Sequence, residues 1–156
     1  MKILLFIGVF LMPVLSYSQD FWIEDIENKT ISGPAVGNRD LTFGVRNILE
    51  ELLQDKGYDI NPESTTKLSI EILYFDVQKT NVQLGTFGKN LDITEIIFRA
   101  TLTKDGKQLK PIVAKGQAKS ISTSTLIIDQ GGKFSQANVS TALKKVCEEV
   151  LTKFEI

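Results

Sequence analysis

Asp76, Asp92 and Glu95 are the residues whose type and spacing could support chemistry, because the sequence places them on two neighbouring predicted strands. Two carboxyl groups about 5–10 Å apart can serve as the catalytic pair of a glycosidase. Exposed acidic residues that balance nearby lysines would give the same pattern. The three residues therefore leave open a hydrolase that uses carboxylates alone, but they do not identify one.

Histidine is absent from the chain and Cys147 is its single cysteine. Without imidazole there is no common neutral-pH base, so serine and cysteine hydrolases that depend on histidine are excluded. Zinc sites built from cysteine and histidine are excluded in the same way. We therefore expect no enzyme activity, no catalytic or metal-binding residues and no cofactor.

Three weaker motifs have ordinary explanations. Asp129 with Gly131-Gly132 lacks both the ligand spacing of a calcium loop and the Gly-Lys-Ser/Thr ending of a phosphate loop, so a plain connection is predicted. Asn28 and Asn138 begin glycosylation sequons, which often arise by chance. Cys147 lies beside an apolar helical stripe, which predicts a buried thiol. An exposed Cys147 would instead allow a disulfide between two molecules, because a single cysteine cannot form an internal one.

The best candidate for binding is the segment 80–90, which connects two predicted strands and is longer than a tight turn. It carries Leu84 and Phe87 among glycines, and long connections on a rigid scaffold often hold function. We therefore predict that Leu84 and Phe87 contact a partner, an envelope protein or peptide. The alternative is that the two strands simply extend and bury both side chains.

The first 18 residues resemble a secretory signal peptide. Lys2 precedes an apolar run over residues 3–15, and Ser16 and Ser18 meet the small-residue rule for cleavage before Gln19. The run is too short to cross a bilayer of about 30 Å comfortably. We expect residues 1–18 to be removed, residues 19–156 to fold as one domain, and the product to be periplasmic or secreted.

The charge of the predicted mature chain argues against nucleic acid as a partner. Without Lys2 the chain has 17 basic and 19 acidic residues, a formal charge of −2, whereas nucleic-acid binding depends on clustered cations. Five lysines gather around a predicted hairpin, where they are more typical of a solvated edge that opposes strand-to-strand aggregation. They are Lys104, Lys107, Lys110, Lys115 and Lys119.

The predicted order of elements is strand, helix, three strands and helix. Asp40 is the expected N-cap of the first helix, Gly57 its end, and Asp105-Gly106 a tight turn between the last two strands. In the strand over residues 68–77 the apolar phase slips, which predicts either a bulge or burial of both faces. The fold class is α+β, with a four-stranded mixed sheet and two helices on one face.

Two sets of apolar positions explain why both helices should pack on this sheet. Ala114, Gly116 and Ala118 point to one side of the last strand and leave room for a close helix. Asn138 or Ser135 is the expected cap of the last helix. The first helix has an apolar stripe at Leu41, Val45, Ile48, Leu49 and Leu52, and the last at Val139, Ala142, Leu143, Val146, Val150 and Phe154.

The chain resembles the YajG-like envelope lipoproteins and related small periplasmic accessory proteins. The resemblance lies in the leader, the segments 24–29, 33–37, 49–58 and 68–72, and the closing amphipathic helix. In that family a lipidated cysteine follows the leader, whereas this chain has Gln19 there, so a soluble protein is expected. The resemblance implies an exported, non-catalytic accessory or binding module. The alternatives are the carboxylate hydrolase and a small carrier with an apolar cavity between sheet and helices.

Overall fold

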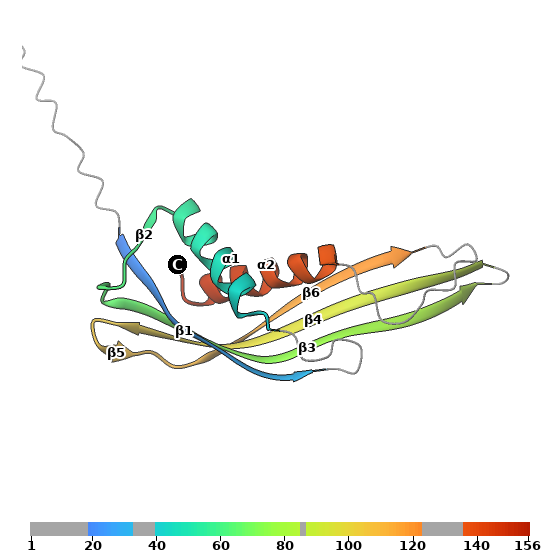
Figure 1. The fold of residues 1–156 in the computed structure, drawn as a ribbon, viewed down its shortest axis with the longest axis horizontal. Helices are drawn as coiled ribbons and strands as arrows, with labels where there is room; N and C mark the ends of the chain where they lie inside the picture. The colour runs from blue at the N-terminus through green and yellow to red at the C-terminus, as the bar shows by residue number, and fades with distance from the viewer. Residues whose placement is uncertain (1–18, 33–39, 85–86, 123–135) are drawn as a thin grey trace, which may run out of the picture.

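The computed structural model describes residues 19–32, 40–84, 87–122 and 136–156. The predicted leader, the loop at 33–37 and the Asp129 motif lie outside these residues. The elements in chain order are β1 (Gln19–Ser32), α1 (Thr42–Asp55), β2 (Tyr58–Ile60), β3 (Thr66–Leu84), β4 (Phe87–Lys104), β5 (Lys107–Gln108), β6 (Ile112–Ser122) and α2 (Gln136–Lys153). Figure 1 shows a long, twisted sheet with both helices on one face.

The α+β class is confirmed, but the predicted count of four strands is too low. Within the described residues the sheet has six strands. Five follow the order β2-β1-β3-β4-β5, and β6 pairs with a different stretch of β4 from β5. β1 is parallel to β2 and β3, and β3, β4 and β6 are antiparallel neighbours. The two unpredicted strands span only three and two residues, too few for an alternating pattern to be visible in the sequence.

The phase slip in β3 is a bulge. The register with β4 shifts between Ile72 and Tyr74, so one extra residue turns the alternation over. As a result Phe75 and Val77 lie on the same face as Ile70 and are buried with it. The other predicted alternative, burial of both faces, would have placed Phe75 and Val77 on the face opposite Ile70, and the bulge is the reason that they do not lie there.

The start of α1 differs by one residue from the prediction. Leu41 is the N-cap, but the Asp40 carboxylate still accepts a hydrogen bond from the Thr42 backbone N–H at 2.9 Å. This hydrogen bond lowers the pKa of Asp40. The predicted end is confirmed, because Gly57 has a positive φ of 85° and its N–H bonds to the Gln54 carbonyl.

The strands of the β3–β4 hairpin are longer than predicted. They stay paired from Thr66 with Lys104 out to Leu84 with Phe87, so segment 80–90 is mostly strand. Polar residues and glycines in this segment suggested a long loop, but backbone pairing with a partner strand outweighs such weak local preferences. The prediction that the connection is a long loop is therefore wrong.

α2 packs closely on β6, as the row of small residues predicted. Ala114, Gly116 and Ala118 are all buried. An added Cβ at Gly116 would lie 2.0 Å from the Ala142 carbonyl oxygen and 2.8 Å from the Val146 backbone nitrogen. Only glycine permits this approach. Asn138, one of the two predicted caps, is instead the third residue of α2, and its amide donates to Ser120 Oγ on β6 at 2.6 Å. The other predicted cap, Ser135, lies outside the described residues.

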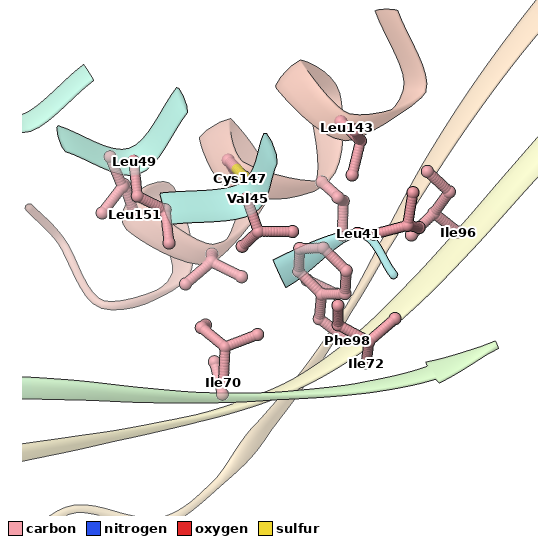
Figure 2. Close-up of a cluster of buried hydrophobic side chains, with 14 of the residues drawn as sticks. Leu41, Val45, Leu49, Ile70, Ile72, Ile96, Phe98, Leu143, Cys147 and Leu151 are labelled. Carbon is pink, nitrogen blue, oxygen red and sulfur yellow. The ribbon is translucent and has the colours of Figure 1, made fainter. Parts of the chain in front are cut away.

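The hydrophobic core lies between the helical layer and the sheet. Side chains from α1 and α2 point toward those from β3 and β4 (Figure 2). Many of them, including Val45, Phe98 and Val146, have no exposed surface. Neither helix in the described part of the chain has the length and hydrophobicity needed to cross a membrane.

Candidate functional site

The structure brings two of the three candidate carboxylates together. Asp76 and Glu95 are directly opposite each other on β3 and β4, and both alternate with buried residues, which places them on the face away from the helices. Asp92 has the same phase along β4 as Thr94 and Ile96, so it belongs to the helix-bearing face. The sequence predicted that the two strands are neighbours, but it did not reveal that Asp92 faces the other way.

Both paired carboxylates have partners in the fold. Asp76 is buried, and it accepts hydrogen bonds from the Val77 N–H at 2.8 Å and the Tyr74 hydroxyl at 3.1 Å. Burial and the Asp76 carboxylate raise the pKa of Tyr74, so its hydroxyl stays protonated and acts as a donor. Glu95 forms an ion pair with Lys115 at 2.6 Å. These contacts give both carboxylates a structural role within the fold.

A second polar group lies further along the open face of the sheet. Glu71 binds Lys29 at 2.6 Å through one carboxylate oxygen and Arg99 at 3.0 Å through the other. The bond from Lys29 lowers the pKa of Glu71, and the bond to Glu27 raises the pKa of Lys29. A groove of about 520 Å³ is lined by Glu24, Glu71 and Arg99, among other residues. Its charged lining does not suit an apolar ligand.

The outer edge of β6 is covered by side chains from α2. Lys153 Nζ donates to the Val113 carbonyl at 2.7 Å, Glu149 accepts the Lys115 N–H at 2.9 Å, and Lys145 Nζ donates to the Gln117 carbonyl at 3.1 Å. Burial raises the pKa of Glu149, but its bonds to Lys153 and the Lys115 N–H outweigh that effect and lower it. Side chains four residues apart on α2 therefore reach backbone groups two residues apart on β6.

The five lysines of the predicted edge cluster are all exposed. Lys107 belongs to β5, and Lys115 and Lys119 belong to β6. Asp105 and Gly106 both have positive φ angles, 51° and 74°, which confirms the tight turn between Lys104 and Lys107. These positions fit a solvated edge rather than a basic groove.

Sequence reasoning missed a groove beside β1. Asp25 and Ile26 of β1 and Thr42, Phe43 and Arg46 of α1 line a hollow of about 270 Å³. Phe43 is 76% exposed. The signal was present in the sequence, because Phe43 lies off the predicted apolar stripe of its helix and so had no core position to fill.

Leu84 and Phe87 are opposite each other at the end of the β3–β4 hairpin. Only their backbone belongs to the described structure, so their role as a partner contact stays a prediction. Asn28, the first sequon residue, lies within β1, and its side-chain oxygen accepts a hydrogen bond from the Thr30 N–H at 3.2 Å. Asn138, the second, is buried within α2, where the asparagine is not accessible for modification.

Cys147 is free and fully buried, as predicted. Burial, with a smaller contribution from Glu148, raises its pKa to about 12 from 9.0. A thiol enclosed in this way cannot cross-link two folded molecules, which excludes the alternative of an exposed Cys147.

We therefore expect native Cys147 to resist a thiol-specific reagent at pH 8 and to react once the chain is unfolded in guanidinium. Because only the unfolded thiol ionises readily from about pH 9, wild type should lose stability relative to Cys147→Ala as the pH rises from about 9 to 12. Absorbance of the released chromophore measures the first effect and denaturant unfolding the second. Rapid labelling of the native protein would contradict the buried position.

A family model described as an uncharacterised lipoprotein matches residues 33–154. The chain belongs to this lipoprotein family. Membership confirms the broader part of the resemblance drawn from the sequence, which is to a lipoprotein family. The YajG-like assignment is finer than this match and stays a prediction. No curated protein matches the chain in sequence.

Solved structures of other lipoproteins are loosely similar to this member of the lipoprotein family. A minor lipoprotein from Acinetobacter baumannii has a TM-score of 0.48 at 9% identity, covering 86% of this chain and 89% of its own. A lipoprotein from Neisseria meningitidis has a TM-score of 0.45 at 11% identity, covering 88% and 98%. Rare lipoprotein B from Shewanella oneidensis has a TM-score of 0.43 at 9% identity, covering 85% and 94%.

Proposed function

We propose that the chain is an exported, non-catalytic accessory module of the cell envelope that binds a protein or peptide partner through the end of its β3–β4 hairpin. In this proposal residues 1–18 are removed on export, residues 19–156 form a single domain, and the protein acts in the periplasm.

The observation that carries the proposal is the length of the hairpin. β3 and β4 continue well past the helical layer (Figure 1). β6 pairs with β4 only as far as Asn90, so of the described strands β3 and β4 alone reach the pair formed by Leu84 and Phe87. The projecting hairpin is held together by backbone pairing between its own two strands. It presents its end to other molecules, which suits a contact element.

The other two functions predicted from the sequence have less support. The hydrolase needs two carboxylates free to act on a substrate, whereas Asp76 and Glu95 are engaged with Tyr74, Val77 and Lys115. The carrier needs space between sheet and helices, whereas at Gly116 the helix backbone lies too close to β6 even for a methyl group. Binding through an exposed surface needs neither.

Replacing Phe87 by serine tests the proposal. We expect Phe87→Ser to retain its melting temperature and to lose one or more envelope proteins that the wild-type chain captures from an envelope extract. Capture is measured by affinity purification and mass spectrometry, and stability by thermal unfolding.

Val113→Ser is the matched control, because Val113 is a 54% exposed apolar residue on β6, away from the hairpin end. This variant should capture the same proteins as wild type. A fall of several degrees in the melting temperature of Phe87→Ser would show that Phe87 packs inside the fold. Unchanged capture with unchanged stability would equally reject the hairpin end as the contact.

A further inference from the structure

The two outer edges of the sheet differ in whether other parts of the fold cover them. The β6 edge is covered by the three α2 side chains described above. On β1, β2 pairs only with Gln19–Phe21. From Trp22 to Ser32 no strand in the described part of the chain pairs with β1 on the side away from β3. An open edge carries backbone N–H and C=O groups able to pair with another strand.

The groove of Asp25, Ile26, Thr42, Phe43 and Arg46 lies between this open edge and the first turns of α1. Arg46 contacts both elements, since it donates to the Ile23 carbonyl at 3.0 Å and lies 5.8 Å from the Trp22 ring centroid. The groove thus has a strand edge on one side and a helix on the other. This is the arrangement in which an extended peptide can add to a sheet and place alternate side chains against a helix.

Of the two charged residues that line the groove, Asp25 and Arg46, only Arg46 has an ion-pair partner among the described residues. Arg46 is within 3.8 Å of Glu50, and the neighbouring acids of β1 are also paired, Glu24 with Lys67 at 3.3 Å and Glu27 with Lys29 at 2.5 Å. Asp25 is exposed and has no ion pair among the described residues. It lines the same hollow as Phe43, whose ring is 76% exposed.

We propose that this groove binds an extended segment of another protein, which adds to the free edge of β1 and carries a lysine or arginine next to an apolar residue. The backbone groups of β1 call for a polypeptide, the Asp25 carboxylate for a cation, and the Phe43 ring for an apolar side chain. The proposal does not depend on Leu84 or Phe87. The hairpin end and the groove are distinct surfaces that can be tested separately.

Three synthetic peptides test the proposal against the full mature chain. The first is a short capped peptide in which lysine and valine alternate, the second has glutamate in place of lysine, and the third is the lysine peptide with alternate backbone nitrogens methylated. Binding is followed by NMR shifts and by protection of β1 amides from hydrogen exchange. We expect the lysine peptide alone to bind and to protect amides within residues 22–32.

Two variants locate the binding. Phe43→Ser should weaken the lysine peptide on the order of tenfold, because it removes the apolar anchor, and Asp25→Asn should weaken it about threefold, as for a solvated ion pair. The controls are Val113→Ser and Glu51→Gln, which change an exposed apolar residue on β6 and an exposed acid on α1. Both controls should bind like wild type, and all four variants should retain the wild-type melting temperature.

Several results would overturn the proposal. Equal binding of the methylated peptide would show attraction between charges without strand addition, and equal binding of the glutamate peptide would exclude a role for Asp25. Protection of β1 that rises with protein concentration in the absence of peptide would show that a second copy of the chain occupies the edge. Failure of the lysine peptide to bind would reject the groove, whereas the hairpin proposal is decided by the Phe87→Ser variant.

Discussion

Gly116→Ala is expected to destabilise the protein by about 3 kcal/mol or more, at the upper end of the cost of overpacking a core. The new Cβ would lie 2.0 Å from the Ala142 carbonyl oxygen and 2.8 Å from both Val146 N and Val146 Cβ. Two of these atoms belong to the helix backbone, which cannot rotate away as a side chain can. Relief requires α2 to move off β6. Urea or guanidinium unfolding should show a lower midpoint with an unchanged slope.

Gly44→Ala is the matched control. Gly44 lies in α1, and its added Cβ would meet Leu143 Cδ1 at 3.6 Å, an ordinary van der Waals contact. Alanine in a helix interior is favoured over glycine by roughly 0.5–1 kcal/mol, so this variant should be slightly more stable than wild type. Equal effects of the two substitutions would show that the close approach of α2 to β6 does not exist in solution.

The sequence was most informative where a local rule coincided with the tertiary structure. Asp105-Gly106 predicted a turn with positive φ angles because few other residue pairs adopt them without strain. The phase slip between Ile72 and Phe75 predicted either a bulge or burial of both faces, and the register with β4 shows that a bulge places both residues on one face. The small residues around Gly116 predicted a close helix because the space that their short side chains leave beside the strand has to be filled by a neighbouring element.

Other features depend on register between distant segments, which one sequence does not reveal. The length of the β3–β4 hairpin follows from pairing of Val82 with Lys89 and Gln83 with Gly88, although none of these residues forms a strong strand pattern alone. The covering of the β6 edge depends on how α2 is rotated. The separation of Asp92 from Asp76 and Glu95 depends on strand phase. Each of these three features is set by tertiary contacts, which outweigh weak local preferences.

Phe43 was overlooked because the sequence does not reveal that α1 lies beside the open edge of β1. A phenylalanine in an amphipathic helix is normally assigned to the core, and the core of this protein does hold Phe21, Phe75 and Phe98. Phe43 differs because its position along α1 directs it away from Val45 and Leu49. Only the placement of α1 beside the open edge of β1 turns this exposed ring into part of a candidate binding surface.

Phe98→Ala is the second substitution for which we expect a large effect, a loss of about 4 kcal/mol in the free energy of unfolding. Phe98 has no exposed surface. Its ring lies beneath Leu41 and beside Ile72, where the helical layer meets the sheet (Figure 2). Alanine would remove the ring and leave a cavity that strands and helices can close only by moving together. Denaturant unfolding followed by circular dichroism measures the change.

Phe43→Ala makes the same chemical change where the ring is 76% exposed. It should alter stability by no more than about 0.5 kcal/mol, as is usual for surface substitutions. A domain of this kind has roughly 5–15 kcal/mol of stability in total, so the Phe98 variant should populate unfolded chains at moderate temperature while the Phe43 variant does not. If both variants lost several kcal/mol, Phe43 would belong to the core, and the groove beside β1 would have no exposed anchor to offer a partner.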